Sequence, residues 1–212
     1  GVLTIGALLG MAAQIDDKGC TVLDMTGMAQ KGGAVTSHIR LARSPKEIYS
    51  SRLGEGMSDL VLACDMIVGA SPAVLKTVKP GETAAILNND VAPTGDFQSN
   101  KTLDLGEARL RANIIEALAG GQAFDLHASQ LATDLTGDSI GTNMLMLGYA
   151  IQRGLLPLSL EAVQQAIRLN GTFVEGNLRT LALGRLAAHE IMRVTDTIRR
   201  LTAQNADAVT IY

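Results

Sequence analysis

Hydrophobic residues near the start of the chain recur at intervals of three and four. A helix over residues 2–15 places them on one side, with Gly6 and Gly10 one turn apart on an adjoining side. The recurring positions are Leu3, Ala7, Leu8, Met11 and Ile15. Because glycine lacks a Cβ, this helix is predicted to pack closely against a neighbouring element.

Short apolar runs bounded by Gly, Asp or Pro follow the pattern of buried strands flanked by helices. Three such runs, 20–25, 59–64 and 83–87, are expected to form parallel strands. Between the first two, residues 34–42 alternate apolar and polar side chains, which is typical of a half-covered antiparallel strand. A further strand is expected at 123–126. The sheet is therefore predicted to be mixed and mostly parallel.

From residue 105 onward the pattern is helical almost without a break. Helices separated by glycine-containing turns are predicted at 106–119, 140–153, 160–169 and 172–201. In the last of them, apolar residues repeat every three or four positions over 187–201, which suits packing on the chain's own sheet or on a partner helix. The whole pattern predicts a three-layer α/β/α, Rossmann-like domain with a mixed, mostly parallel sheet and a helix-rich C-terminal half.

Composition excludes several classes of protein. Of 212 residues, 47% are hydrophobic and 18% charged, with a mean hydropathy of +0.20, so intrinsic disorder is excluded. A net charge of −3 and an aromatic content of 3% leave neither the basic surface nor the stacking platforms of a nucleic-acid binder. The longest apolar stretch, 1–13, is shorter than the roughly 20 residues that cross a bilayer. We expect neither nucleic-acid nor membrane partners.

The sequence predicts no catalytic residue and no metal ligand in this chain. Cys20 and Cys64 lie in strand-like runs, where a free thiol behaves as a small hydrophobe, and this fits a reducing, cytoplasmic setting. An iron–sulfur cluster generally needs four thiolates, and a structural zinc site four Cys or His ligands. No nucleophile has an activating base nearby in sequence, and His127 and His189 lack metal-ligand spacing.

The most unusual stretch, residues 26–38, directly follows the first predicted strand. It contains Lys31 next to the pair Gly32-Gly33, and then hydroxyl side chains. Ligands of open α/β sheets gather beyond the carboxyl ends of strands, and adjacent glycines let backbone N–H groups approach a phosphate. The stretch matches neither G-x-x-x-x-G-K-[ST] nor G-x-G-x-x-G, so a ligand-binding loop and a plain turn are both compatible with it.

Polar residues also follow the strand at 83–87. Asn88, Asn89 and Asp90 stand at its carboxyl end, where they can bind a ligand, cap a helix or form a turn. On the alternating strand, His38 is out of phase with the core-facing Ser37 and is expected to face solvent or an interface.

Four stretches carry a resemblance to a known family. They are GVLTIG at 1–6, the loop and strand at 26–38, GTNMLMLG at 141–148 and GLLPLSL at 154–160. The chain resembles the gamma domain of the 2-oxoacid:ferredoxin oxidoreductases, and within them the indolepyruvate ferredoxin oxidoreductase branch. The likeness runs from the first residue to about Ala187. We expect a single domain over 1–212, truncated at its N-terminus before the first helix, with a helical extension at 188–212.

The resemblance implies part of an enzyme that converts a 2-oxoacid, coenzyme A (CoA) and oxidised ferredoxin into an acyl-CoA, CO2 and reduced ferredoxin. It implies that thiamine diphosphate, Mg²⁺ and iron–sulfur clusters are held by partner domains, and that none is held by this chain alone. The expected partners are the other subunits or domains of the same oxidoreductase and, through the whole enzyme, ferredoxin. A homo-oligomer is also expected, and the isolated domain is expected to be inactive.

In this family the domain is linked to CoA handling and to packing beside the thiamine site. Only the last residue of the glycine-rich turn before the first helix is present, and the start of that helix is a natural anion site. Lys31 and its neighbours match the family's second loop. The predicted cofactor-binding residues are Gly1, Thr4, Gln30, Lys31, Gly32, Gly33, Thr36, Ser37 and, from its place after a strand, Asn89.

Two other functions compete with this one. A free-standing nucleotide-binding dehydrogenase needs a complete glycine fingerprint followed about 20 residues later by an acidic residue on the ribose. Asp24 ends a strand as such an acid would, but the fingerprint before it is missing or cut off. A purely structural interface module is favoured if residues 27–33 are buried against a partner without room for a ligand.

Overall fold

A three-stranded parallel sheet forms the middle layer of the protein. The computed structural model describes residues 2–27, 34–90 and 106–209. The strands, in the order β3-β4-β5, are β3 (Leu60–Ala63), β4 (Ala84–Asn88) and β5 (Ala123–Leu126). All five residues of the central strand β4 are buried, because helices cover both faces of the sheet. This burial explains the continuous apolar run in the sequence.

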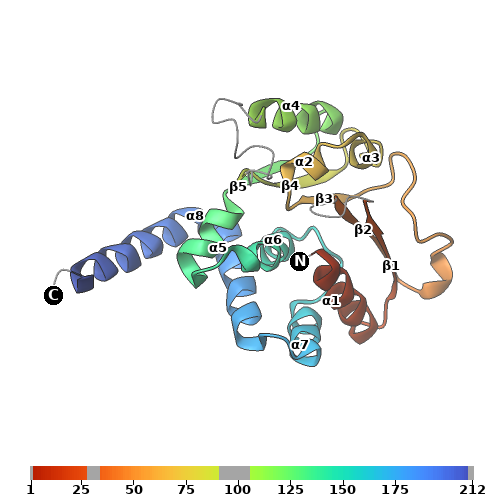
Figure 1. Ribbon diagram of the computed structural model, residues 1–212. Coiled ribbons are helices and arrows are strands. Elements are labelled where there is room, and N and C mark those ends of the chain that lie inside the picture. The colour runs from red at the N-terminus through yellow and green to blue at the C-terminus, as the bar shows by residue number, and fades with distance from the viewer. Residues whose placement is uncertain (1, 28–33, 91–105, 210–212) are drawn as a thin grey trace.

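Helices on the two faces make this part of the molecule a three-layer α/β/α structure (Figure 1). Leu87 of β4 packs in one core with Ile114 and Leu118, and its neighbour Ile86 packs on the other face with Met146. The first face carries α2 (Met66–Gly69), α3 (Pro72–Leu75) and α4 (Glu107–Leu118), and the second α5 (Ala128–Thr136), α6 (Thr142–Gln152) and the first part of α8 (Val174–Val209). The predicted fold class is confirmed.

The first predicted strand does not belong to the parallel sheet. It is β1 (Gly19–Thr26), which pairs antiparallel with β2 (Val35–Ala42) in a separate two-stranded ladder, and β5 is the third parallel strand. Our expectation of parallel neighbours at 20–25, 59–64 and 83–87 was therefore wrong for the first run. The chain reverses directly after β1, and a hairpin needs no crossover helix to bring its two strands together.

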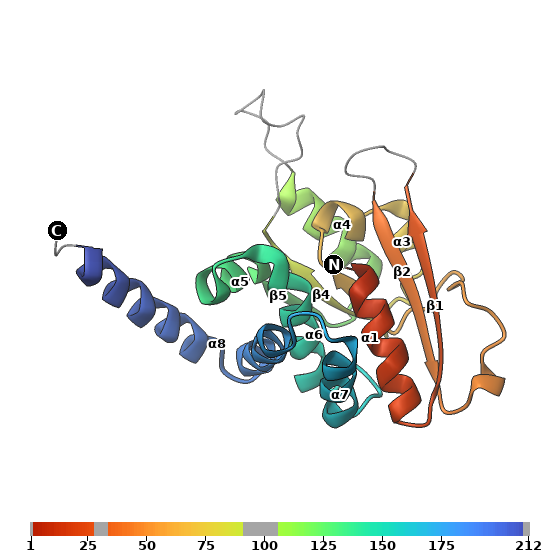
Figure 2. The same ribbon diagram turned by 60° about the horizontal axis from the view of Figure 1, so that its bottom comes forward.

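Helix α1 (Val2–Ile15) lies between this hairpin and α7 (Leu160–Asn170) (Figure 2). A Cβ added at Gly6 would stand 2.9 Å from Val22 Cγ1, so the predicted close packing of this helix is confirmed. The carboxylate of Asp16 accepts hydrogen bonds from the backbone N–H (2.6 Å) and hydroxyl (2.7 Å) of Ser159, the N-cap residue of α7. These contacts fix α1 and α7 against each other.

Helices α6 and α8 approach each other so closely that glycine is needed at two positions. A Cβ at Gly148 would stand 2.1 Å from the carbonyl oxygen of Leu181, and one at Gly184 would stand 1.9 Å from that of Leu145. Two single turns of 3-10 helix, η1 (Pro45–Glu47) and η3 (Ser139–Gly141), complete the described elements.

Helix α8 is the predicted last helix, and it continues eight residues beyond the expected end at 201. It is kinked at Glu190, whose backbone is non-helical (φ −153°, ψ 80°), and the segment after the kink projects away from the body (Figures 1 and 2). No helix within the described ranges is long and apolar enough to span a membrane.

Candidate functional site

The end of the β1-β2 hairpin at which β1 turns into β2 lies against the first half of α1. Asp24 and Ser37 are paired across the ladder, and the Ser37 hydroxyl donates a hydrogen bond to Asp24 Oδ1. Both side chains are on the α1 side, because a Cβ at Gly6 would stand 3.8 Å from Asp24 Oδ1 and 4.0 Å from Ser37 Oγ. The predicted inward direction of Ser37 is confirmed, and the element that covers it is α1.

Only some of the predicted cofactor-binding residues lie within the described ranges. Thr4 is half-buried in the first turn of α1, two residues before the glycine that covers the Asp24–Ser37 pair. Thr36 is paired with Met25 and lies on the opposite face of the hairpin from Ser37, because successive residues of a strand alternate. Five predicted residues lie outside the described ranges: Gly1, Gln30, Lys31, Gly32 and Gly33.

The start of α1 has unpaired backbone donors. The first N–H groups of a helix have no partner within it, and the helix dipole places about half a positive charge there. No side chain of the residues that the structure describes accepts a hydrogen bond from this first turn, and the turn contains no acidic residue. Donors of this kind suit an anionic group of a ligand or of a partner chain.

A second polar cluster lies at the carboxyl end of β4, where Asn88 is 2% exposed. Its Nδ2 donates to the carbonyl oxygen of Cys64 (3.1 Å) and to Ser129 Oγ (2.8 Å). Its Oδ1 accepts from the N–H groups of Ala128 (3.0 Å) and Ser129 (3.4 Å) in the first turn of α5. Asn88 therefore ties β3, β4 and α5 together as a structural residue.

Asp90 completes the capping of α5. Its Oδ2 accepts from the Gln130 N–H at 2.8 Å, and its Oδ1 lies 2.9 Å from Nδ1 of the exposed His127. Of the alternatives for the Asn-Asn-Asp stretch, the helix cap is confirmed for Asn88 and Asp90. The N-terminus of α5 is thus occupied by the chain's own side chains and offers little to an outside anion.

Asn89, a predicted cofactor-binding residue, contacts β5. Its N–H donates to the carbonyl oxygen of Leu126 at 2.7 Å, and its side chain donates to Asp125. Asp125 also forms a two-pronged ion pair with Arg111, with N···O distances of 2.8 and 2.7 Å. The hydrogen bonds from Arg111 lower the pKa of Asp125 in spite of its partial burial. The Oδ1 atom of Asn89 is buried without a hydrogen-bond partner among the described residues.

His38 holds a neighbouring loop. Its Nδ1 accepts a hydrogen bond from the Leu53 N–H at 3.0 Å, on the hairpin face away from α1. The opposite-face prediction is confirmed, although the ring is half-buried under this loop. Burial, and then the charge of Arg52, lower the pKa of His38, so the neutral acceptor form is favoured.

The two cysteines are free and poorly suited to thiolate chemistry. Burial raises the pKa of Cys64 to about 12 and also raises the pKa of Cys20. At neutral pH both are therefore thiols rather than thiolates. No group of three or more His, Cys, Asp or Glu side chains in the described part of the chain is arranged to hold a metal ion.

Sequence reasoning missed helix α5 and the Asp24–Ser37 hydrogen bond. The nine residues of α5 have only three buried positions, too few to establish a helical period. The residues that could have indicated the start of α5 are its caps, Asn88 and Asp90. They lie about 40 residues before α5 in the sequence, so a local pattern does not connect them with it. The Asp24–Ser37 pair follows from the register of the hairpin, which the pattern of each strand alone does not define.

Comparison with protein families gives a match over most of the chain. The model of the family described as pyruvate ferredoxin/flavodoxin oxidoreductase matches residues 1–187. The match includes every strand and helix up to α7 and ends within α8, three residues before the kink.

Several archaeal proteins are similar along nearly their whole length. The indolepyruvate oxidoreductase subunit IorB of Thermococcus kodakarensis is 26% identical over 198 residues, covering 91% of this chain and 92% of that protein. The subunit of the same name from Methanothermobacter thermautotrophicus is 27% identical over 194 residues, covering 90% and 93%.

Solved structures share the fold. The gamma subunit of a keto/oxoacid ferredoxin oxidoreductase from Geobacter sulfurreducens PCA has a TM-score of 0.55 at 18% identity, covering 88% of this chain and 90% of its own. Subunit PORC of a pyruvate oxidoreductase from Thermotoga maritima has a TM-score of 0.57 at 18% identity, with coverages of 86% and 87%.

Proposed function

This chain belongs to the pyruvate ferredoxin/flavodoxin oxidoreductase family, and we propose that it is the gamma subunit or domain of an indolepyruvate-type 2-oxoacid:ferredoxin oxidoreductase. The whole enzyme would convert a 2-oxoacid, CoA and oxidised ferredoxin into acyl-CoA, CO2 and reduced ferredoxin. The observation that carries the proposal is the similarity to proteins named as indolepyruvate oxidoreductase subunits, which extends over 91% of this chain and 92% of one such relative.

The role that we propose for this chain is assembly and the positioning of CoA. The N–H groups of the first turn of α1 meet no side chain among the described residues, and Asp24 and Ser37, on either side of the predicted loop, lie against Gly6 of the same helix. The phosphates of CoA would be met by these N–H groups and by the charge of Lys31, with Thr4 and Ser37 nearby. The hydroxyl of Ser37 lies on the face of the hairpin that packs against α1, and this supports the placement.

The cofactors of the reaction are assigned to the other subunits. Thiamine diphosphate, Mg²⁺ and the iron–sulfur clusters would be bound there, and ferredoxin would be met through the assembled enzyme. The two thiols of this chain support the assignment, because both have raised pKa values and cluster ligands are thiolates. Free cysteines also agree with the reducing, cytoplasmic setting that we propose.

We also propose that the chain self-associates through the part of α8 beyond its kink. The apolar repeat over 187–201 supplies the seam. Val194, in this seam, is already buried within the chain itself (1% exposed), so the proposal depends on the other apolar positions of the repeat. Sedimentation at micromolar concentration tests this point, and a monodisperse monomer would contradict it.

The dehydrogenase alternative finds less support. In a nucleotide-binding Rossmann fold the acidic residue follows a strand of the parallel sheet and accepts hydrogen bonds from the ribose. Here Asp24 belongs to an antiparallel hairpin and already accepts a hydrogen bond from Ser37.

Calorimetric titration of the chain, alone and co-purified with its partner subunits, tests the proposed role. We expect saturable binding of CoA and none of NAD, with Lys31→Ala weakening CoA about tenfold, the equivalent of one lost charged contact. Lys46→Ala, on the exposed η1, is the matched control and should bind as the unsubstituted chain does. Binding of NAD alone would favour the dehydrogenase. Binding of neither ligand in either form would favour the interface module.

A further inference from the structure

A groove between α6 and α8 is lined by α8 residues that come just before the kink at Glu190. Helix α8 lies on the side of the molecule away from the β1-β2 hairpin (Figure 1). The groove has a volume of about 310 Å³. Two cationic or titratable side chains, one amide and two apolar side chains line it: Arg185, His189, Gln152, Ala182 and Leu186. None of these lining residues belongs to α1 or to the hairpin, and the groove has no part in the CoA role proposed above.

Arg185, which lines the groove, and Arg153, which follows the lining residue Gln152 in the chain, are both held in place by uncharged groups. Arg185 Nε donates to Gln152 Oε1 at 3.0 Å. The guanidinium carbon of Arg153, the residue that ends α6, lies 4.9 Å from the ring centre of Phe124 and 5.2 Å from that of Tyr149. Arg153 Nη2 also donates to the Tyr149 hydroxyl at 3.1 Å. Both positive charges are therefore oriented before any partner arrives.

Neither arginine is neutralised within the part of the chain that is described. The ion pairs found there join Lys76, Lys79, Arg111 and His127 to carboxylates, and none involves Arg153 or Arg185. In a chain with a net charge of −3, two oriented and unneutralised guanidiniums form a local positive site. An arginine fixed in advance loses less conformational entropy when it binds a carboxylate.

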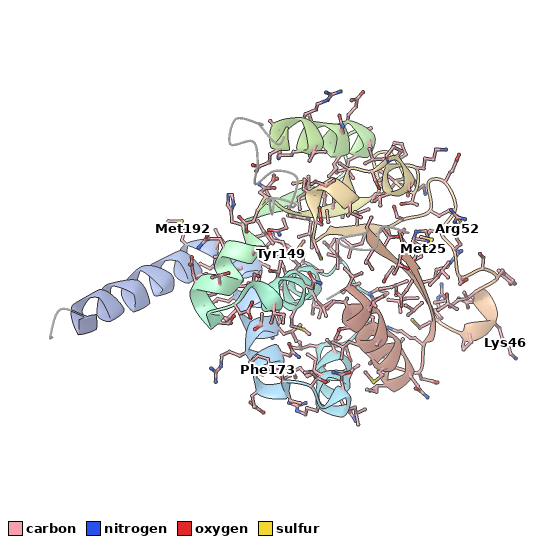
Figure 3. All side chains as sticks on the ribbon, viewed as in Figure 1. Met25, Lys46, Arg52, Tyr149, Phe173 and Met192 are labelled. Carbon is pink, nitrogen blue, oxygen red and sulfur yellow. The ribbon has the colours of Figure 1, made fainter. Side chains whose placement is uncertain are left out.

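Apolar side chains continue the groove toward the projecting part of α8. Ile191 is 43% exposed and Met192 64% exposed, and Figure 3 shows Met192 and Tyr149 on the side from which α8 projects. Aromatic residues, Met and Arg are enriched in protein interfaces, whereas a small-molecule site is more deeply enclosed. We call Arg153, Arg185, His189, Ile191 and Met192 the α6–α8 surface.

We propose that the α6–α8 surface docks an acidic segment of another subunit of the oxidoreductase, with Asp or Glu side chains on Arg153 and Arg185 and apolar contacts on Ile191 and Met192. Charge complementarity argues for this occupant, because carboxylates pair in two-pronged fashion with the guanidinium fork. The inference rests on the proposed function, since it assumes that the chain assembles with such subunits.

Charge reversal tests the proposal. The double variant Arg153→Glu/Arg185→Glu is expressed with the partner subunits, and its dissociation constant is measured at several NaCl concentrations. We expect affinity to fall about tenfold or more and its salt dependence to flatten. Arg109→Glu, at an exposed arginine in the first turn of α4, changes the charge by as much as either single substitution of the double variant and should assemble normally. The milder Arg185→Gln should weaken assembly about threefold, which covers misfolding of the double variant.

The outcomes separate three cases. Unchanged affinity and salt dependence in the double variant would overturn the docking surface and leave the proposed function intact. If citrate raises the melting temperature of the unsubstituted chain but not that of the double variant, and assembly is unchanged, the docking surface is overturned in favour of a site for small anions. If the unsubstituted chain fails to assemble with oxidoreductase subunits, the proposed function and this inference both fall.

Discussion

The first turns of α5 and α1 differ in what accepts hydrogen bonds from their backbone N–H groups. Each has N–H groups without partners inside the helix. In α5 they are met by Asn88 and Asp90, at distances of 2.8 to 3.4 Å. In α1 no described side chain meets them. A terminus capped by the chain's own side chains contributes stability and has little left for a ligand, whereas donors that meet no described side chain can serve a ligand. Stability and binding should therefore respond to substitution at different ends of the fold.

The largest effect is expected from Asn88→Ala. The substitution leaves buried donors and acceptors of β3 and α5 unpaired, so the free energy of unfolding should fall by about 3 kcal/mol. Urea denaturation measures this change. CoA affinity of the folded variant should be unaltered, and Asn89→Ala, at the adjacent and less buried position, should cost less. A loss below about 1 kcal/mol would show that α5 is held by packing rather than by its cap.

A smaller effect is expected from Asp90→Ala. It removes the acceptor for the Gln130 N–H, and loss of an N-terminal cap typically costs about 1 kcal/mol. Thermal unfolding followed by circular dichroism detects it. Asp90→Asn keeps a capping oxygen and should recover most of the loss; equal instability of both variants would attribute the effect to the contact with His127 instead.

At α1 the order of effects should be reversed. Ser37→Ala removes one exposed hydrogen bond to Asp24, so stability should change by about 0.5 kcal/mol or less, while CoA affinity falls about threefold. Thr36→Ala, on the other face of the hairpin, should have a weaker effect on CoA binding. If Thr36→Ala proves the more damaging to calorimetric binding, the ligand lies on the face away from α1.

The smallest effect concerns pH. Because the pKa of His38 is lowered in the folded chain, its contribution is complete above the ordinary value of 6.5 and is lost as the pH falls through the folded value. His38→Asn keeps an acceptor for Leu53 but cannot be protonated in this range. Its melting temperature should fall less between pH 7.5 and 5.5 than that of the unsubstituted chain, by on the order of 1 °C. Identical pH profiles would contradict this role for His38.

Periodicity predicted most elements of the fold because their apolar faces are buried. β4 and α6 show this best, since nearly every residue of each lies in a core. Strand partners were harder to predict: nothing in 20–25 distinguishes a strand that continues a parallel sheet from one that reverses in a hairpin. The choice depends on where the chain turns after Thr26.

The sequence predicted only those features of the candidate site that depend on a single strand or helix. Ser37 facing α1 follows from strand alternation, and the unpaired start of α1 follows from the helix itself. The roles of Asn88 and Asp90 depend on α5, which is distant in sequence and is brought to them by the order of the strands. Contacts of this kind need the three-dimensional arrangement.

A small change of backbone angle at the Glu190 kink produces a large displacement at the far end of α8. The helical segment that follows it, 191–209, is about 28 Å long at 1.5 Å per residue. A rotation of about 20° at this pivot, comparable to ordinary scatter in backbone angles, displaces the far end by about 10 Å. Substitution at this one position is therefore expected to change where the far end of α8 stands relative to the sheet, and with it the position of Ile191 and Met192, the part of the α6–α8 surface that follows the kink.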